Sequence, residues 1–371
     1  LVRDGNFTAP VLPGEYTATL SRGFEYDMRR EDITVVAGET VTVEATLSRV
    51  VDTTGWISLD THDHSELSID SNILVEDRIY AAVAEGVEVF SLTDHDHFGT
   101  LQPVVEELGQ EDQVHCILGN EVSPLYGHQV GLGCSPMEYD QYFSMNWTLY
   151  DDTDSFVRVK TPSEVWAEMR EVHGCKLVAV AHPYCSQAMF EFYKLDENTD
   201  PASLDLDQID VRLLDAVELI NSHDEWDEIF TQNLPGWANL VNRGYLLPIT
   251  GGADSHAISQ TIGHPRNLVL SATDNPGDVD EDVLLGAVKN FRSEIYGGPF
   301  IRFTLDGQGL GETVVPQGEK MTAKIDVFAP AWMELGYVRL HGNGELLSEF
   351  VPVGNEILRL SETVELDVPS G

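Results

Sequence analysis

The chain has 371 residues, with 21 Lys and Arg against 63 Asp and Glu, which gives a formal net charge of −42 at pH 7. This acidic excess argues against binding to duplex DNA or RNA, because affinity for the phosphate backbone depends on clustered basic side chains. With 42% hydrophobic and 9% aromatic residues, the composition is that of a folded protein. No apolar run approaches the roughly 20 residues that a membrane-spanning helix needs, so we expect no membrane span.

The first fifty residues alternate apolar and polar side chains between turn signals, as at 14–20, 33–36 and 40–47. Alternation with a period of two, rich in Thr and Val, is typical of β-strands. We therefore expect an N-terminal β module over residues 1–50. The chain begins at Leu1 within this pattern, as expected of a processed or trimmed chain.

In the central part of the chain, residues 51–298, short apolar runs alternate with helical periods. Strands are expected at 56–59, 87–92, 115–118, 177–181, 216–220, 246–249 and 268–270. A helix is expected from Thr161 to His173, because Thr161 and Glu164 form a capping box with Pro162 at the first helical position. The alternation predicts parallel βα units that close, or nearly close, into a barrel.

The C-terminal part, residues 299–371, returns to an alternating pattern. Strands are expected at 300–305, 321–328 and 337–340, which predicts a second β module. Residues 138–154 are polar and aromatic without a clear period, so we expect a long loop there.

The cysteines show neither metal-type spacing nor the density of a disulfide-framed fold. They are Cys116, Cys134, Cys175 and Cys185. We expect most of them to be buried thiols.

Histidines and acidic residues follow the ends of the predicted strands. The candidates are His62, His64, Asp70, His95, Glu121, His128, His182, Asp254 and His256. The carboxyl ends of the strands in a parallel barrel form one rim, so these side chains converge although they are far apart in sequence. Imidazoles mixed with carboxylates suit transition-metal ions, and their number exceeds one tetrahedral shell. The sequence therefore predicts two or three divalent ions, with zinc, manganese and iron as the candidates.

Each of these residues also has an ordinary interpretation. Asp70 can be the cap of a helix that begins near Asn72, and an isolated histidine is usually a surface or core residue. We expect no ligand role for the remaining histidines His115, His173, His223 and His341.

Six motifs occur in order between residues 56 and 270. They are Asp60-x-His62-x-His64-Ser65, Thr93-Asp94-His95, Gly119-x-Glu121, Gly127-His128, Ala181-His182-Pro183 and Ala253-Asp254-Ser255-His256. As a set they resemble the PHP (polymerase and histidinol phosphatase) metallohydrolase superfamily, and the short step from Glu121 to His128 with flanking β modules looks like its CehA/McbA branch. The resemblance implies an α/β fold with a distorted (β/α)7 barrel. The small N-terminal and C-terminal β-sandwich-like modules expected to flank the barrel are predicted from the sequence pattern alone.

The resemblance also implies a ligand set for three ions. His62, His64, Glu121 and Asp254 would hold the first ion, Glu121 would bridge to a second held by His128 and His182, and Asp70, His95 and His256 would hold the third. The family often has Asp-Leu-His where this chain has Asp60-Thr61-His62, a change that we expect to point away from the ions.

Four further residues receive roles around the ions. We expect Asp60 and Asp94 to accept hydrogen bonds that orient ligand imidazoles. His97 is expected to protonate the leaving group or to contact the substrate, so Asp94 and His97 are the catalytic candidates. Arg266 is expected at the surface in preference to a contact with a phosphate.

The activity that the resemblance implies is a metal-dependent hydrolase that uses a metal-activated hydroxide on phosphomonoesters or phosphodiesters. A carbamate, ester or amide hydrolase with the same metals is the alternative, and a non-catalytic, metal-stabilised binding protein is a second one. We expect a small-molecule substrate and leave a protein partner of the β modules open. Composition and the β modules lead us to expect an extracytoplasmic location, periplasmic or secreted.

Overall fold

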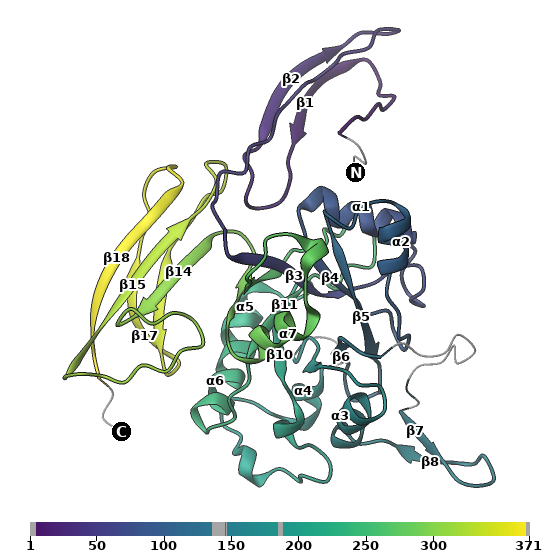
Figure 1. Cartoon of the computed structure of the whole chain (residues 1–371), viewed down its shortest axis with the longest axis vertical. Helices are drawn as coiled ribbons and strands as arrows, with labels where there is room; N and C mark the ends of the chain where they lie inside the picture. The colour runs from purple at the N-terminus through teal and green to yellow at the C-terminus, as the bar shows by residue number, and fades with distance from the viewer. Residues whose placement is uncertain (1–4, 136–144, 146, 185–187, 369–371) are drawn as a thin grey trace.

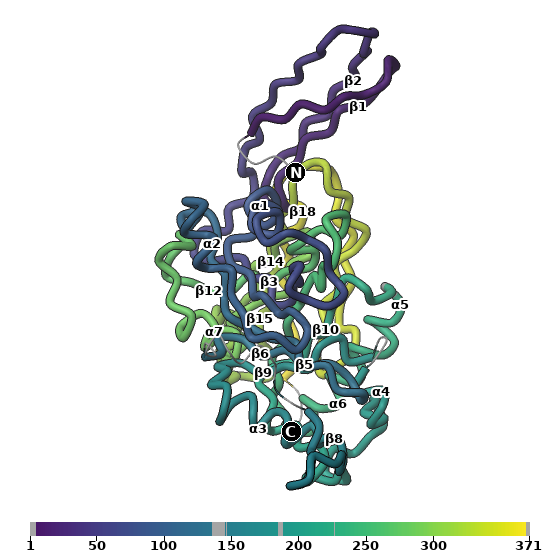
Figure 2. The backbone as a smooth tube through the Cα atoms, turned by 90° about the vertical axis from the view of Figure 1, so that its right-hand side faces the viewer, coloured from purple at the N-terminus to yellow at the C-terminus, as the bar shows by residue number. Residues whose placement is uncertain are grey.

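The computed structural model describes residues 5–135, 145, 147–184 and 188–368. A β-hairpin near the N-terminus projects from one end of a central α/β unit, and β-sheets of the C-terminal part pack at its side (Figure 1). The view turned by 90° shows the same projecting hairpin (Figure 2).

The central unit is a nine-stranded sheet with the order β11-β10-β9-β6-β5-β4-β3-β12-β13. Its strands are β3 (Trp56–Asp63), β4 (Val89–Leu92), β5 (His115–Val122), β6 (Gln129–Leu132), β9 (Leu177–Val180), β10 (Ala216–Asn221), β11 (Ile249–Gly252), β12 (Arg266–Leu270) and β13 (Ser293–Tyr296). Strand β11 also packs beside β3, and the Asp254 N–H donates to the His62 carbonyl (2.7 Å). The sheet is therefore nearly closed.

The strand directions differ from the expected barrel of seven parallel strands. Parallel pairing holds in β3-β4-β5 and in β9-β10-β11. Strand β6 runs antiparallel between β5 and β9, and β12 runs antiparallel to β3 and β13. Only residues 123–128 join β5 to β6, and a connection this short permits antiparallel pairing alone, because parallel neighbours need a crossover of about a dozen residues.

Seven α-helices accompany the sheet in the described part of the chain. They are α1 (Val75–Glu85), α2 (Gln102–Glu107), α3 (Pro162–Glu171), α4 (Met189–Tyr193), α5 (Trp226–Glu228), α6 (Leu234–Asn242) and α7 (Glu281–Lys289). The capping box expected for α3 is confirmed, because Thr161 Oγ1 accepts from the Glu164 N–H (3.4 Å) and Glu164 Oε2 accepts from the Thr161 N–H (2.8 Å). Helix α1 begins at Val75 after Leu74, so Asp70 does not cap it.

The apolar core continues from the central sheet into the C-terminal part. Buried Val51, Leu268, Tyr296 and Phe300 form one cluster, and the rings of Trp56 and Phe300 meet edge to face at 5.6 Å. Phe24 and Val50 pack against the same cluster, so the packing crosses both expected domain boundaries, 50/51 and 298/299. These boundaries stay predictions.

The N-terminal part is an antiparallel hairpin of β1 (Gly14–Leu20) and β2 (Arg29–Val35). The strand expected at 40–47 does not form, which makes that prediction wrong. Alternation provides only a local preference, and a strand also needs a neighbouring backbone with which to pair; among the described residues, none pairs with this segment.

The C-terminal part contains two antiparallel sheets. They are formed by β14 (Phe300–Leu305), β15 (Lys320–Phe328) and β18 (Leu358–Asp367), and by β16 (Val338–Gly342) and β17 (Glu345–Phe350). The strands expected here are confirmed as β14, β15 and β16, and the sequence pattern had not indicated β17 or β18.

Part of the long loop expected at 138–154, residues 138–144 and 146, lies outside the described residues. Its described end carries β7 (Thr148–Tyr150), which pairs with β8 (Phe156–Val159).

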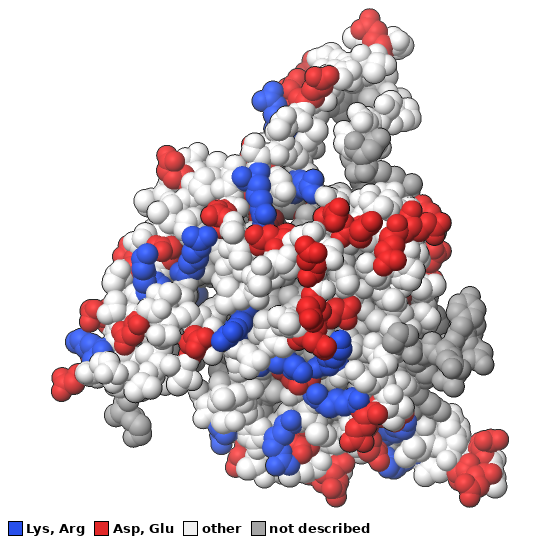
Figure 3. Space-filling model, viewed as in Figure 1, with Lys and Arg blue, Asp and Glu red and all other residues white. Residues whose placement is uncertain are grey.

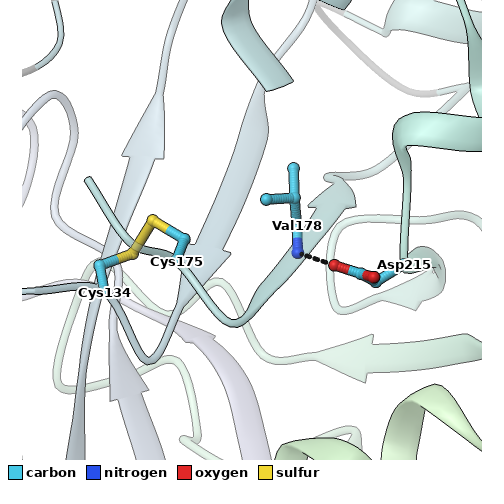
Figure 4. The surroundings of a disulfide bond; sticks show 4 residues. All are labelled: Cys134, Cys175, Val178 and Asp215. Carbon is cyan, nitrogen blue, oxygen red and sulfur yellow. Dashed lines mark hydrogen bonds between the residues drawn. A yellow bond between two sulfur atoms is a disulfide. The ribbon is translucent and has the colours of Figure 1, made fainter. Parts of the chain in front are cut away.

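A disulfide bond joins Cys134 and Cys175 (Figure 4). Cys116 is a buried thiol and Cys185 lies outside the described residues, so the expectation of mostly buried thiols is wrong for the bonded pair. The two cysteines meet because Cys134 follows β6 and Cys175 precedes β9, its antiparallel neighbour. Beside them, the Val178 N–H donates to Asp215 Oδ2 (2.9 Å).

Acidic side chains are widespread on the face of the molecule that Figure 3 shows. In the face shown in Figure 3, Asp and Glu side chains are spread over the hairpin, the central unit and the C-terminal sheets, with Lys and Arg between them. A search of the described helices finds none long and apolar enough to cross a bilayer.

Candidate metal centre

The nine predicted ligands converge at one end of the central sheet. His62 and His64 lie at the end of β3, and Glu121 lies near the end of β5. The loops after β4, β9 and β11 and the loop before β6 supply His95, His182, Asp254, His256 and His128. Asp70 comes from the loop between β3 and α1. The convergence predicted from the strand ends is thus found in the fold, with antiparallel β6 contributing from its starting end.

The backbone is unusual where two of these residues leave their strands. Asp254 has a φ of 48° and His182 a φ of 26°, in the left-handed region that non-glycine residues rarely adopt. Such conformations persist where the surroundings determine them, and they occur often at functional sites.

The Glu121 carboxylate lies at the centre of the cluster. Its Oε2 lies 3.2 Å from His62 Nε2, 3.4 Å from His64 Nε2 and 3.0 Å from His95 Nδ1. Its Oε1 lies 2.9 Å from His128 Nδ1 and 3.2 Å from His182 Nε2. Each oxygen therefore faces a different group of imidazoles, as expected of a carboxylate that bridges two cations.

Two further carboxylates extend the cluster. Asp254 Oδ1 lies 3.0 Å from His64 Nε2 and 3.3 Å from His62 Nε2. Asp70 Oδ2 lies 3.1 Å from His95 Nε2 and 3.2 Å from His256 Nε2. Asp70 is thus part of the cluster, at its more exposed edge.

The donor atoms fall into groups that can each surround one cation, with all donor atoms of a group within 4.8 Å of one another. They are His62, His64, Glu121 and Asp254; His64, Asp70, His95 and His256; and His95, Glu121 and His128. The first group matches the ligand set implied for the first ion. The second group contains the set implied for the third ion, with His64 in addition. In the third group His95 stands where His182 was expected, although His182 also contacts Glu121 Oε1.

The donor atoms fit a metal better than they fit one another. His62 Nε2 and Glu121 Oε2 are buried and lack a hydrogen bond among the described residues, yet they face each other at 3.2 Å. His62 Nδ1 lies 3.1 Å from the Glu218 carboxylate, so the neutral ring carries its proton on Nδ1 and a lone pair on Nε2. Two facing lone pairs repel unless a positive charge, either a proton on the ring or a metal ion, lies between them.

The electrostatics keep the buried carboxylates ionised. Burial alone would raise the pKa of Glu121, but His62 and His128 hold that pKa well below its ordinary value. Burial would likewise raise the pKa of Asp254, and the charge of His62 with the hydrogen bond from His64 lowers it well below the usual range. Anionic oxygens surrounded by imidazoles are ligands for divalent cations, which can take the place of the protons on the rings.

The pKa values of the imidazoles shift in opposite directions. Burial would lower the pKa of His62, but Asp254 and Glu121 raise it well above its ordinary value. Burial lowers the pKa of His64 to about 4. The pKa of His95 rises to about 9, because Glu121 and Asp70 outweigh the effect of its burial.

Asp60 and Asp94 do not orient imidazoles, which corrects the expectation. Asp60 accepts hydrogen bonds from the N–H groups of His62 (3.2 Å), Ala253 (3.0 Å) and Gly263 (2.6 Å). Asp94 is fully buried and accepts from the Ser65 N–H (2.6 Å) and hydroxyl (2.8 Å). These short side chains reach neighbouring backbone groups and so hold the chain segments that carry the ligands.

The other catalytic candidate, His97, lies in the segment after β4, two residues beyond His95. Its half-buried ring packs against Gly99, where an added Cβ would lie 2.9 Å from His97 Cδ2. Burial lowers the pKa of His97. The ring makes no hydrogen bond to the described residues, so the roles of His97 and Asp94 in catalysis stay predictions.

Arg266 is buried, so its expected surface position is wrong. It donates to the carbonyl oxygens of Gly263 (2.8 Å), Gly86 (3.1 Å) and Glu85 (3.0 Å). Gly86 and Glu85 lie at the C-terminal end of α1, where the carbonyl groups lack partners within the helix and favour a cation.

Sequence reasoning missed three residues that support the cluster. Glu218, in β10, contacts His62 and His182, and its only signal was an acidic residue within an apolar strand. Arg78, in α1, is buried and donates from Nε to the His64 carbonyl (2.8 Å) and from Nη2 to the Ser255 carbonyl (2.6 Å). It thereby ties together the segments that follow β3 and β11.

The third missed residue, His223, had been expected to play no part. Its Nε2 lies 3.1 Å from the Asp254 carbonyl oxygen, and its donor atoms group with those of Asp254 and His256. An isolated histidine in a loop gives no signal of such a position in the sequence.

Residues 60–239 match the family model for the PHP domain. This match, over just under half of the chain, supports a relationship to the PHP superfamily. The match includes all the predicted ligands except Asp254 and His256, which follow it in sequence. No curated protein matches the chain significantly.

Solved structures with some similarity to the chain come from bacteria. One is a two-domain protein from Bacteroides vulgatus containing a predicted PHP-like metal-dependent phosphoesterase, with 16% identity, a TM-score of 0.46, and coverage of 89% of this chain and 100% of that one. An amidohydrolase from Chromobacterium violaceum with bound sulfate has 16% identity, a TM-score of 0.35, and coverage of 56% and 90%.

A third, from Bifidobacterium adolescentis, is named as a proposed metal-dependent phosphoesterase and has 16% identity, a TM-score of 0.37, and coverage of 62% and 94%. Similarities this low carry no functional information. The relationship to the PHP superfamily therefore rests on the family match alone, and the CehA/McbA branch stays a prediction.

Proposed function

We propose that the chain is a metal-dependent hydrolase of small-molecule phosphomonoesters or phosphodiesters, with two or three divalent ions of zinc, manganese or iron. The observation that carries the proposal is the Glu121 carboxylate, whose two oxygens face separate groups of imidazoles. The buried Nε2 of His62 and Oε2 of Glu121, which have no hydrogen bond among the described residues, support it. The PHP domain match is consistent with this chemistry.

The chain offers ligands for three neighbouring cations. His62, His64, Glu121 and Asp254 would hold one, Glu121 with His128 and His182 or His95 a second, and Asp70, His95, His256 and His64 a third. Bound divalent ions lower the pKa of water toward neutrality and polarise a phosphoryl or carbonyl oxygen.

The exposure of the ligands indicates where substrate enters. Glu121 and His62 are at most 1% exposed, whereas the side chains of Asp70, His223 and His256 are 44%, 42% and 20% exposed. Substrate therefore reaches the centre past these three residues. Loaded with three divalent ions, the site is net positive despite its carboxylates, so an anionic phosphoester is compatible with a chain of charge −42.

Around the centre, residues of this chain orient the ligands. The Ser123 hydroxyl lies 2.7 Å from His95 Nδ1, and the Ser68 hydroxyl lies 3.2 Å from His64 Nδ1 and donates to Asp70 Oδ1 (2.8 Å). Such hydrogen bonds fix the orientation of each ring, which keeps a metal site ready for its substrate.

A substrate panel tests the proposed reaction. The purified chain, supplied with zinc, manganese or iron, is assayed on p-nitrophenyl phosphate, bis-p-nitrophenyl phosphate and aryl methylcarbamates, with His62→Ala as the inactive control. We expect turnover of a phosphoester that depends on metal and is lost in His62→Ala. Turnover of carbamates alone would replace the phosphoester proposal with the carbamate, ester or amide alternative. Tight metal binding without turnover of any substrate would favour the non-catalytic binding protein.

We also propose an extracytoplasmic location, periplasmic or secreted. The disulfide between Cys134 and Cys175 supports it, because such bonds persist in oxidising compartments. Fractionation of producing cells tests this, and recovery of the chain in the cytosol with both cysteines reduced would contradict it.

A further inference from the structure

Glu218 is a buried carboxylate outside the predicted ligand set. It lies in β10 between Val217 and Leu219, and its exposed fraction is 0%. A carboxylate within an apolar strand is costly to bury unless its oxygens are hydrogen-bonded or paired with charge. Its contacts therefore indicate why it lies there.

Glu218 contacts candidate ligands that face both oxygens of Glu121. Glu218 Oε1 lies 3.1 Å from His62 Nδ1, and Glu218 Oε2 accepts from the His182 N–H (2.8 Å). Asn221 Nδ2 donates to Glu218 Oε2 (3.2 Å) and to Asp254 Oδ2 (3.3 Å). One carboxylate thus touches His62 and His182 directly and Asp254 through Asn221.

The contact with His62 selects the tautomer of its ring. An ionised carboxylate only accepts hydrogen bonds, so the proton of the neutral imidazole lies on Nδ1. Nε2 then presents its lone pair to Glu121 Oε2 (3.2 Å) and Asp254 Oδ1 (3.3 Å), where a cation would lie. A carboxylate behind a ligand histidine also makes the ring a stronger donor to the metal.

Strand β11 packs tightly against the contact between Glu218 and His62. A Cβ added at Gly252 would lie 2.1 Å from Glu218 Oε1 and 2.5 Å from His62 Cβ. Strand β11 therefore passes so close that only glycine fits, and it confines the carboxylate and the ring against each other.

We infer that Glu218 is a positioning residue of the metal centre: it fixes the tautomer of His62 and anchors the start of the loop that carries His182. This inference rests on the proposed metal-dependent function. Because Glu218 reaches ligands on both sides of Glu121, it sets the affinity for ions at both positions.

Zinc binding and imidazole NMR test the inference. Wild type, Glu218→Gln, Glu218→Ala and the control Glu294→Gln are titrated with zinc against a competing chelator, and the tautomer of His62 is read from long-range ¹H–¹⁵N spectra of the zinc-loaded proteins. Glu294 is also a carboxyl group of the central sheet, in β13, and its hydrogen bond comes from the Ile301 N–H. The control therefore changes a carboxyl group of the same sheet away from the ligands.

We expect wild type to show His62 protonated at Nδ1 and bound through Nε2. Zinc affinity should fall by about 10-fold in Glu218→Gln, whose amide oxygen still accepts a hydrogen bond, and by about 100-fold in Glu218→Ala. Glu294→Gln should bind zinc as wild type does. If Glu218→Ala fails to fold, Glu218→Gln, which has the same shape, still decides the question.

Two results separate the inference from the proposed function. Wild-type affinity in both Glu218 variants, or equal losses in Glu294→Gln, would overturn the positioning role while leaving the metal centre intact. A wild-type chain that binds none of zinc, manganese and iron would overturn the proposed function and, with it, the role of Glu218.

Discussion

Glu121 Oε1 lies 3.2 Å from His182 Nε2, so a carboxylate of strand β5 meets an imidazole from the loop after β9. The other oxygen of Glu121 lies 3.2 Å from His62 Nε2 at the end of β3. One side chain thus connects three strand ends, and changes at Glu121 should affect more than one cation.

Glu121 and His128 should differ in how many ions depend on them. Among the ligands, His128 bonds to Glu121 Oε1 (2.9 Å), whereas Glu121 contacts five imidazoles. We expect His128→Ala to lose about one ion and Glu121→Ala to lose about two, with kcat/KM lower by at least about 1,000-fold in Glu121→Ala, or about 4 kcal/mol. Isothermal titration with zinc measures the number of ions bound, and kinetics on a phosphoester measure kcat/KM. Equal stoichiometries in the two variants would contradict the bridging position of Glu121.

Metal removal should destabilise the fold near neutral pH. Without cations, the ionised Glu121 and Asp254 are balanced only by protonated imidazoles, and metal bound to the folded chain alone adds stability by mass action. We expect a chelator to lower the melting midpoint by about 5 °C or more, and added zinc to restore it. Calorimetry of wild type and Glu121→Ala measures this. An equal response of both proteins to chelator would show that the effect arises elsewhere.

Glu294 should make stability depend on pH. Burial raises its pKa to about 8. A carboxyl group whose pKa is raised on folding contributes fully to stability below its unfolded pKa of about 4.5, and that contribution is lost as the pH rises through 8. Glu294→Gln should therefore be more stable than wild type at pH 8, by about 1 kcal/mol because the side chain is only partly buried.

Urea denaturation at pH 5 and pH 8 measures the effect of Glu294→Gln. The advantage of the variant should shrink toward pH 5, where the wild-type carboxyl group is protonated in the folded chain. An advantage of the same size at both pH values would contradict the raised pKa.

The disulfide should stabilise the folded chain. Cys134 and Cys175 are separated by 41 residues, and closing a loop of that length restricts the unfolded chain. We expect Cys134→Ser with Cys175→Ser to lower the free energy of unfolding by about 3–4 kcal/mol. Urea denaturation with and without reductant measures it, and the double variant serves as the control that reductant should not affect. A wild-type midpoint unchanged by reductant would contradict a stabilising bond.

The convergence of the candidate ligands was largely predictable from the sequence because these residues follow strand ends. His62 and His64 follow from alternation in an extended segment, and Glu121, His182 and Asp254 from the apolar runs before them. Which strand ends meet depends on the sheet closing on itself, and the near approach of β11 to β3 supplies that closure.

Other features depend on partners that a single sequence does not name. Antiparallel β6, the pairing of Cys134 with Cys175 and the contact of Glu218 with His62 all arise from neighbouring strands. The alternating segment at 40–47 lacks such a neighbour among the described residues, and there the local pattern predicted a strand that does not form. Asp60 and Asp94 were placed beside the right segments but bond to backbone groups there.

The number of divalent ions held by the wild-type chain tests the account most directly. The protein is incubated with zinc, manganese or iron, freed of unbound metal and submitted to elemental analysis, beside Glu121→Ala. We expect about two or three equivalents in wild type with at least one of these metals, and about one or fewer in the variant. Less than one equivalent in wild type with all three metals would contradict the metal centre.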